Sequence, residues 1–261
     1  MHPYLIDFGF FKLPTYGLLF AGGVLLAWIW FTRRAKQMKL PEDKVFNLAF
    51  YSLLGGIIGA KLLLVIVDWR DYVAAPSLLL GTLRTAGVLV GGVVGGAVIF
   101  IGYARRHQLP LLRLADAIVA PLALAQALGR FGCFAAGCCY GEPVAAEHPL
   151  GVVFDNPDSI AYSSHAGQTL IAVQPLEATV DLVIVALLTL LGRRRPEPEG
   201  TVLWCYLLLY GIARFTIEFW RGDRGRGLYF NDLISTSQLF AIAGIAIGLV
   251  MLLRSRLARR S

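Results

Sequence analysis

Apolar stretches long enough to cross a lipid bilayer recur along the whole chain. Crossing a hydrocarbon core of about 30 Å takes roughly 20 apolar residues in a helix. Of the 261 residues, 57% are hydrophobic and only 16% are charged, which excludes a soluble globular fold. We count seven such stretches, at about 15–32, 46–67, 83–104, 114–134, 176–192, 202–220 and 236–253. The sequence therefore predicts an all-α integral membrane protein with about seven transmembrane helices, organised as a single polytopic domain over residues 1–261.

Basic residues gather after the first, third, fifth and seventh stretches, which places them on one side of the membrane. They are Arg33, Arg34, Lys36, Lys39 and Lys44, then Arg105, Arg106 and Arg113, then Arg193, Arg194 and Arg195, and finally Arg254, Arg256, Arg259 and Arg260. Loops rich in Lys and Arg face the cytoplasm. We therefore predict an external amino terminus, a cytoplasmic carboxyl terminus and an external loop over residues 138–175, which contains no Lys or Arg. On this interpretation the net charge of +7 reports topology, and no nucleic-acid partner is expected.

Four cations lie within or at the edge of apolar stretches: Lys61, Arg84, Arg130 and Arg214. The second, fourth and sixth stretches run outward and carry Lys61, Arg130 and Arg214 in their later halves. The third stretch runs inward and has Arg84 at its start. All four cations are therefore expected to lie toward the outer leaflet. A buried cation in a membrane must be paired, hydrated or bound to an anionic ligand. Guanidinium groups suit phosphate because they donate two parallel hydrogen bonds. We interpret the four as lining a cavity for an anionic headgroup; the alternative is four separate side chains that reach to the interface.

The sixth stretch carries Tyr210, Arg214, Glu218 and Arg221 at spacings of four, four and three, so one helical face presents them all. Glu218 lies between two arginines and is expected to orient them. Such a stripe can form the wall of a binding site, or it can simply hold helices together.

The fourth stretch ends in the string Gly-Arg-Phe-Gly-Cys-Phe-Ala-Ala-Gly-Cys-Cys-Tyr-Gly, residues 129–141. Three of the four cysteines, Cys133, Cys138 and Cys139, are therefore clustered at the external side. Of the possible roles of this cysteine cluster, we rank a disulfide or structural thiols first, because an external location permits oxidation. A nucleophilic thiol activated by Arg130 ranks second. A metal site ranks third and is not expected, because the spacing fits no known zinc finger, although His148 and His165 follow in the loop.

These residues resemble the bacterial prolipoprotein diacylglyceryl transferase family, a group of seven-helix inner-membrane enzymes with an external amino terminus. The resemblance covers nearly the whole chain. The residues that carry it are Tyr16-Gly17, Asp116, Ala120-Pro121, Gly129-Arg130-Phe131-Gly132, Gly137, Gly141, Tyr210-Gly211, Arg214-Phe215, Glu218-Phe219, Arg221 and the run from Ser235 to Gln238.

The resemblance implies a multi-pass protein of the bacterial inner membrane that acts at its outer leaflet. It implies transfer of the diacylglyceryl group of phosphatidylglycerol to the lipobox cysteine thiol of prolipoprotein signal peptides, without a cofactor. A thioether forms and glycerol phosphate leaves. The catalytic residues implied are Arg130, Arg214, Tyr16 and Tyr210, and the substrate-binding residues are Arg130, Arg214, Glu218, Arg221, Gly141 and Cys133.

The chain departs from the family pattern at several polar positions. Val90 stands where the family usually has a histidine, Cys133 replaces an asparagine and Cys138 replaces an acid. A longer His-Pro motif is reduced to Gln174-Pro175-Leu176-Glu177. Two alternatives follow for a divergent paralogue: a lipid-modifying enzyme with another acceptor, or a non-catalytic phospholipid-binding membrane protein. Because the histidine is a candidate base, we expect weak standard transfer unless another group accepts the thiol proton.

Overall fold

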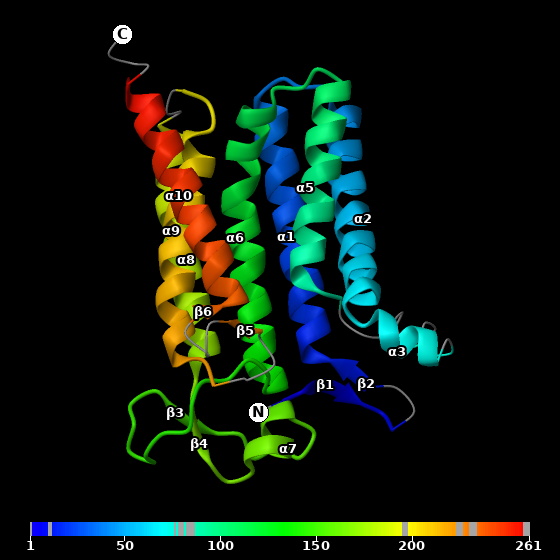
Figure 1. The fold of residues 1–261 in the computed structure, drawn as a ribbon. Coiled ribbons are helices and arrows are strands. Elements are labelled where there is room, and N and C mark those ends of the chain that lie inside the picture. The colour runs from blue at the N-terminus through cyan, green and yellow to red at the C-terminus, as the bar shows by residue number, and fades with distance from the viewer. Residues whose placement is uncertain are drawn as a thin grey trace. The chain divides into compact units, whose positions relative to one another are not determined.

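The computed structural model confirms the helical membrane architecture (Figure 1). The structure describes residues 2–9, 12–75, 77, 81, 87–194, 198–222, 227–229 and 234–257. Seven helices in these ranges are long and apolar enough to cross a membrane. They are α1 (Thr15–Gln37), α2 (Glu42–Val67), α5 (Leu89–Arg106), α6 (Leu111–Ala136), α8 (Val173–Arg193), α9 (Thr201–Ile217, continued by the 3₁₀ turn η1, Glu218–Trp220) and α10 (Thr236–Leu257). Each coincides with one predicted stretch, although the predicted start of the third falls partly outside the described residues.

Short elements complete the described chain. The helices α3 (Trp69–Ala74) and α7 (Ile160–His165) have six residues each. Three antiparallel strand pairs join β1 (Tyr4–Asp7) to β2 (Lys12–Pro14), β3 (Gly151–Val153) to β4 (Thr169–Ile171), and β5 (Leu228–Tyr229) to β6 (Ile234–Ser235).

The chain divides into two compact units, Thr32–Leu114 and a second unit made of Met1–Phe31 and Ala115–Ser261. In the first unit α2 and α5 are antiparallel and pack closely against each other through glycines. A Cβ atom on Gly91 would lie 2.6 Å from Leu63 Cβ and would clash with the Gly59 carbonyl group. Gly56 and Gly92 face each other in the same way. Small residues at this spacing let two helices approach closely in lipid, so the glycines of both stretches serve packing.

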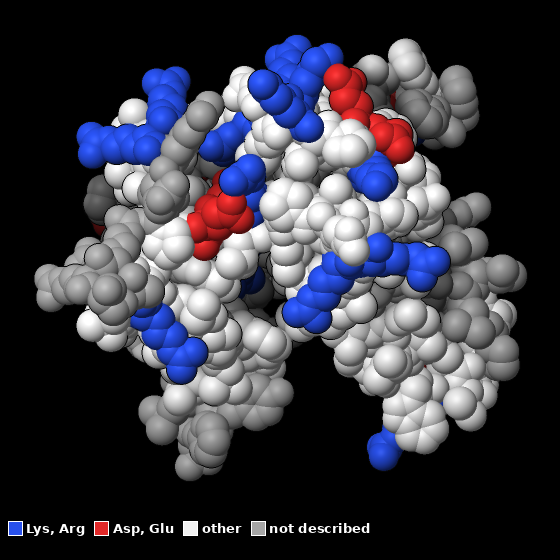
Figure 2. Space-filling view, turned by 90° about the horizontal axis from the view of Figure 1, so that it is seen from above, with Lys and Arg blue, Asp and Glu red and all other residues white. Residues whose placement is uncertain are grey.

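Charged residues stand at the ends of both long helices in this unit. Arg105 and Arg106 occupy the last turn of α5, and Glu42 and Asp43 occupy the first turn of α2. Figure 2 shows the molecule from above, and Lys and Arg are the predominant charged side chains on that face. The orientation of the protein in the membrane remains the prediction made from this pattern.

In the second unit α6, α8 and α9 enclose an apolar core. Its buried members are Val119, Ala120, Ala123, Ile184, Leu188 and Val202. Helix α10 packs against α9, where a Cβ atom on Gly211 would lie 2.9 Å from the Ala241 carbonyl oxygen. Asp116 fixes the start of α9, since its carboxylate accepts hydrogen bonds from the backbone N–H groups of Gly200 (2.7 Å) and Leu203 (2.8 Å).

The predicted loop 138–175 is a small folded element. Tyr140, Phe154, Ala161 and Leu170 form its buried apolar cluster. Its first residues are anchored in the second unit, because the Glu142 N–H donates to the Trp220 carbonyl (3.2 Å) and the Gly222 N–H donates to the Tyr140 carbonyl (3.2 Å). These bonds hold the end of the cysteine-rich string beside the residues that follow α9.

Candidate active site

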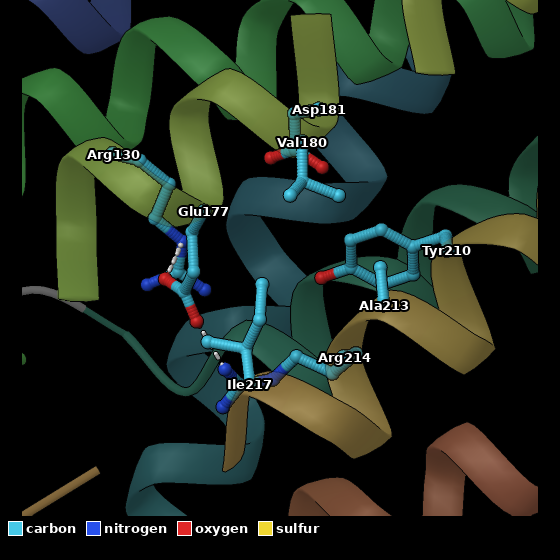
Figure 3. Close-up of a pocket in the computed structure, with 8 residues that line it drawn as sticks. All are labelled: Arg130, Glu177, Val180, Asp181, Tyr210, Ala213, Arg214 and Ile217. Atoms are coloured by element: carbon cyan, nitrogen blue, oxygen red, sulfur yellow. Dashed lines mark hydrogen bonds and ion pairs between the residues drawn. The ribbon is translucent and has the colours of Figure 1, made fainter. Parts of the chain in front are cut away.

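Glu177 lies at the centre of a buried network of arginines (Figure 3). Its carboxylate pairs with Arg130 Nε at 2.8 Å through one oxygen and with Arg214 Nη1 through the other. Arg221 Nη1 lies 4.0 Å from the same carboxylate. The Glu177 side chain is only 5% exposed, so these pairs form in a region largely shielded from water.

A second carboxylate fixes Arg214 from the other side. Arg214 Nη2 lies 2.7 Å from Glu218 Oε2 and donates to the Ser237 hydroxyl at 3.1 Å. The Ser237 hydroxyl in turn donates to Glu218 Oε1 at 2.9 Å. The position of the Arg214 guanidinium is therefore set by residues of α8, η1 and α10.

The local sequence explains how these side chains meet. Glu177 and Asp181 are four residues apart on α8, and Tyr210 and Arg214 are four apart on α9, so each pair shares one helical face. Arg130 comes from α6, two turns before the helix ends at Ala136. Three helices thus contribute charged or polar residues to a single point.

A small pocket lies between these faces. Its lining residues are Arg130, Glu177, Val180, Asp181, Tyr210, Ala213, Arg214 and Ile217. Figure 3 shows the Tyr210 hydroxyl directed toward the space between Asp181 and the ion pairs. Among the described contacts Arg130 pairs through Nε, which leaves its two terminal nitrogens available to donate to a ligand. Preorganised donors of this kind suit a phosphate group.

The structure brings together most of the predicted site residues. Arg130, Tyr210 and Arg214 line the pocket, and Glu218 and Arg221 join it through ion pairs. Gly141 pairs with Arg221 in a β-bridge, where a Cβ atom would lie 2.6 Å from the Trp220 carbonyl oxygen. Gly141 therefore positions Arg221 and does not line the pocket.

Tyr16 also lies outside the lining. It is in the first turn of α1 and is in close contact with α6, since a Cβ atom on Gly132 would lie 3.1 Å from Tyr16 Cα. Of the four predicted membrane cations, Arg130 and Arg214 lie together. Lys61 is on α2 in the other unit, and Arg84 is outside the described residues.

Sequence reasoning did not assign Glu177, Asp181 and Ser237 to the site. A usable signal was present, because two carboxylates four residues apart on an apolar helix are costly in lipid and indicate a functional cluster.

The thiols of Cys133, Cys138 and Cys139 form a second cluster, with all three sulfur atoms within 4.8 Å of one another and no disulfide among them. Cys133 is buried in the last turn of α6, and the Cys138 N–H donates to its carbonyl at 3.0 Å. Hydrogen bonds from the thiols of Cys133 and Cys138 lower the pKa of Cys139, and the guanidinium groups of Arg221 and Arg130 lower it further. The cluster is thus electrostatically coupled to the pocket arginines.

The sequence matches the model of the family described as prolipoprotein diacylglyceryl transferase over residues 3–254. The chain belongs to this family. It is 35% identical over 250 residues to the phosphatidylglycerol–prolipoprotein diacylglyceryl transferase of Clostridium tetani strain Massachusetts / E88. The aligned region covers 95% of this chain and 96% of that protein.

Two further relatives carry the same activity in their names. Phosphatidylglycerol–prolipoprotein diacylglyceryl transferase 2 of Clostridium perfringens strain 13 / Type A is 34% identical over 92% of this chain and 90% of its own length. The transferase of Synechococcus elongatus strain ATCC 33912 / PCC 7942 / FACHB-805 is 30% identical over 95% of this chain and 85% of its own length. Together with the seven candidate spans, membership of the diacylglyceryl transferase family identifies a multi-pass enzyme of the bacterial inner membrane that acts in lipoprotein lipidation.

Proposed function

We propose that this chain transfers the diacylglyceryl group of phosphatidylglycerol to the lipobox cysteine thiol of prolipoprotein signal peptides. The observation that carries the proposal is the buried Arg130–Glu177–Arg214 bridge, because it holds two guanidinium groups at one pocket within a membrane family that uses an anionic lipid. The terminal nitrogens of Arg130 would bind the phosphate, and Arg214, fixed by Glu218 and Ser237, would bind it from the second side.

The chemistry follows from this placement. The acceptor sulfur, as a thiolate, attacks the glycerol carbon that carries the phosphate ester. The new S–C bond forms as the C–O bond breaks, and the bonding electrons leave on the phosphate oxygen of glycerol phosphate. The arginines stabilise the negative charge that grows on this leaving group, which is the largest contribution that preorganised donors make. Arg221 adds positive charge at the edge of the network, and Tyr210 lines the wall.

The proposal places the site at the external side of the membrane. Cysteine substituted at Ser164 should react with an impermeant thiol reagent in intact cells, whereas cysteine at Ser255 should react only after lysis. Reaction of Ser255→Cys in intact cells would overturn this orientation.

The most direct functional test is complementation of a strain depleted of its own diacylglyceryl transferase, followed by a purified assay. Phosphatidylglycerol vesicles and a lipobox peptide should yield the diacylglyceryl-peptide and an equal amount of glycerol phosphate. A peptide with serine in place of the cysteine is the matched control. Tight phosphatidylglycerol binding without product would instead favour the non-catalytic lipid-binding alternative, and lipid turnover without modified peptide would favour another acceptor.

A further inference from the structure

The three-thiol cluster has a geometry that no part of the proposed lipid site uses. The three sulfur atoms form a triangle whose sides are at most 4.8 Å long, so a central point lies no more than about 2.8 Å from each sulfur, and a Zn–S bond is about 2.3 Å long. Each side chain therefore needs to move by only about half an ångström to hold one zinc ion.

The backbone is arranged so that all three thiols converge. Gly137 and Cys139 both have positive φ, at 68° and 60°, which turns the chain sharply after α6. For a residue other than glycine this conformation is uncommon and is concentrated at functional sites. Gln174 Nε2 donates to the Cys138 carbonyl at 2.7 Å and supports the turn from α8.

A disulfide does not account for this arrangement. Bridging Cys133 to Cys138 or to Cys139 would use two thiols and leave the third beside the bond. Thiolate sulfur, by contrast, is a preferred zinc ligand, and three cysteines supply most of the ligands in Cys3His sites. The guanidinium groups of Arg130 and Arg221 interact electrostatically with Cys139 and would offset the single net negative charge of a divalent ion bound by three thiolates.

We infer that Cys133, Cys138 and Cys139 bind one Zn²⁺ ion and leave its fourth coordination position for the thiol of the acceptor peptide. The three sulfurs form the whole group of candidate ligands found around this point among the described residues. Zinc sites with three protein ligands keep one position open for a substrate. This part of the inference rests on the proposed function.

The role of the ion would be to supply the thiolate. A thiol that coordinates zinc loses its proton, and the proton leaves to solvent water before transfer. The zinc-bound sulfur then attacks the glycerol carbon, the C–O bond breaks, and the ion stays divalent throughout.

The test is metal analysis of the full chain, purified in detergent under argon without chelators. We expect about one zinc per chain in the wild type and in Cys205→Ser, the matched control for a cysteine outside the cluster. Cys133→Ser, Cys138→Ser and Cys139→Ser should each lose the metal. Cobalt substituted for zinc should show sulfur-to-cobalt charge-transfer absorption, and a cysteine peptide, but not its serine analogue, should change the d–d bands.

A second experiment uses only the wild-type protein, so its result does not depend on whether the cysteine variants fold. Removing zinc with a chelator should make three more thiols reactive toward an alkylating reagent. Zinc-free native protein with these three thiols already reactive would overturn the inference, as would a disulfide among them in freshly alkylated membranes. Zinc bound by all three cysteines without lipid transfer would sustain the metal site and refute the proposed function, so the two failures are distinguishable.

Discussion

In the unit Thr32–Leu114, α2 and α5 meet backbone to backbone, whereas in the other unit α6, α8 and α9 meet through buried charges. The first contact depends on missing side chains, as at Gly59 and Gly91. The second depends on the Arg130–Glu177–Arg214 bridge. Small residues pack helices in lipid without any chemistry of their own, while buried ionisable groups are costly and are retained where they serve a function. The first contact therefore serves packing, and under the proposed function the second contact is where the reaction takes place.

The same comparison distinguishes buried from exposed ion pairs. Lys36 and Glu42 lie 2.9 Å apart with side chains 71% and 70% exposed, and Glu177 pairs at 2.8 Å with its side chain 5% exposed. Similar distances thus correspond to different energies, because solvent screens the first pair and not the second.

The largest effect on stability is expected from Glu177→Gln. Removing this carboxylate charge leaves two buried guanidinium groups without their shared partner, which costs about 3–5 kcal/mol for a buried pair. Thermal denaturation in detergent micelles should show a large decrease in the melting temperature. Glu42→Gln is the control and should change the unfolding free energy by less than about 1 kcal/mol. Equal effects of the two substitutions would remove the distinction between the pairs.

The next largest effect is expected from Gly91→Leu. Its side chain would be forced against the Gly59 carbonyl and Leu63, and overpacking of this kind costs about 1–3 kcal/mol. Limited proteolysis and thermal denaturation measure the decrease in stability. Gly102→Leu on the same helix is the control, because a Cβ atom there meets nothing within 4 Å. A wild-type melting curve for Gly91→Leu would contradict the close α2–α5 packing.

A smaller effect is expected from Asp116→Ala. The substitution removes the acceptor for the first N–H groups of α9, and loss of such a cap costs about 1 kcal/mol. Asp116→Asn keeps an acceptor oxygen and should recover much of the stability. If the alanine and asparagine variants melt alike, the carboxylate does not act through these hydrogen bonds.

The sequence predicted the spans well because each is a long apolar run, and the stripe from Tyr210 to Arg221 followed from helical spacing alone. The partners of those arginines were harder to find. Glu177 meets Arg130 and Arg214 only after three helices pack together, and no local pattern states which helices are neighbours. The convergence of Cys133, Cys138 and Cys139 depends on the positive φ of Cys139. The sequence does not predict this conformation, because positive φ is uncommon for residues other than glycine.

The strand pair β3–β4 was missed for a related reason. Each strand has only three residues, too few for an alternating pattern to be recognised. The sequence predicted only an external loop or head insertion over residues 138–175, in which Tyr140 and Phe154 belong to a small buried core.

Transfer by Arg130→Ala and Arg214→Ala tests the central claim most directly. Purified variants would be assayed for diacylglyceryl transfer to a lipobox peptide from phosphatidylglycerol vesicles, with the exposed Arg193→Ala on α8 as the control. Loss of a donor to the developing phosphate charge should lower the rate by about 100-fold or more. Lysine at either position should rescue poorly because it lacks the planar guanidinium. Arg193→Ala should retain the wild-type rate, and folded Arg130→Ala and Arg214→Ala variants that also retain it would contradict the account.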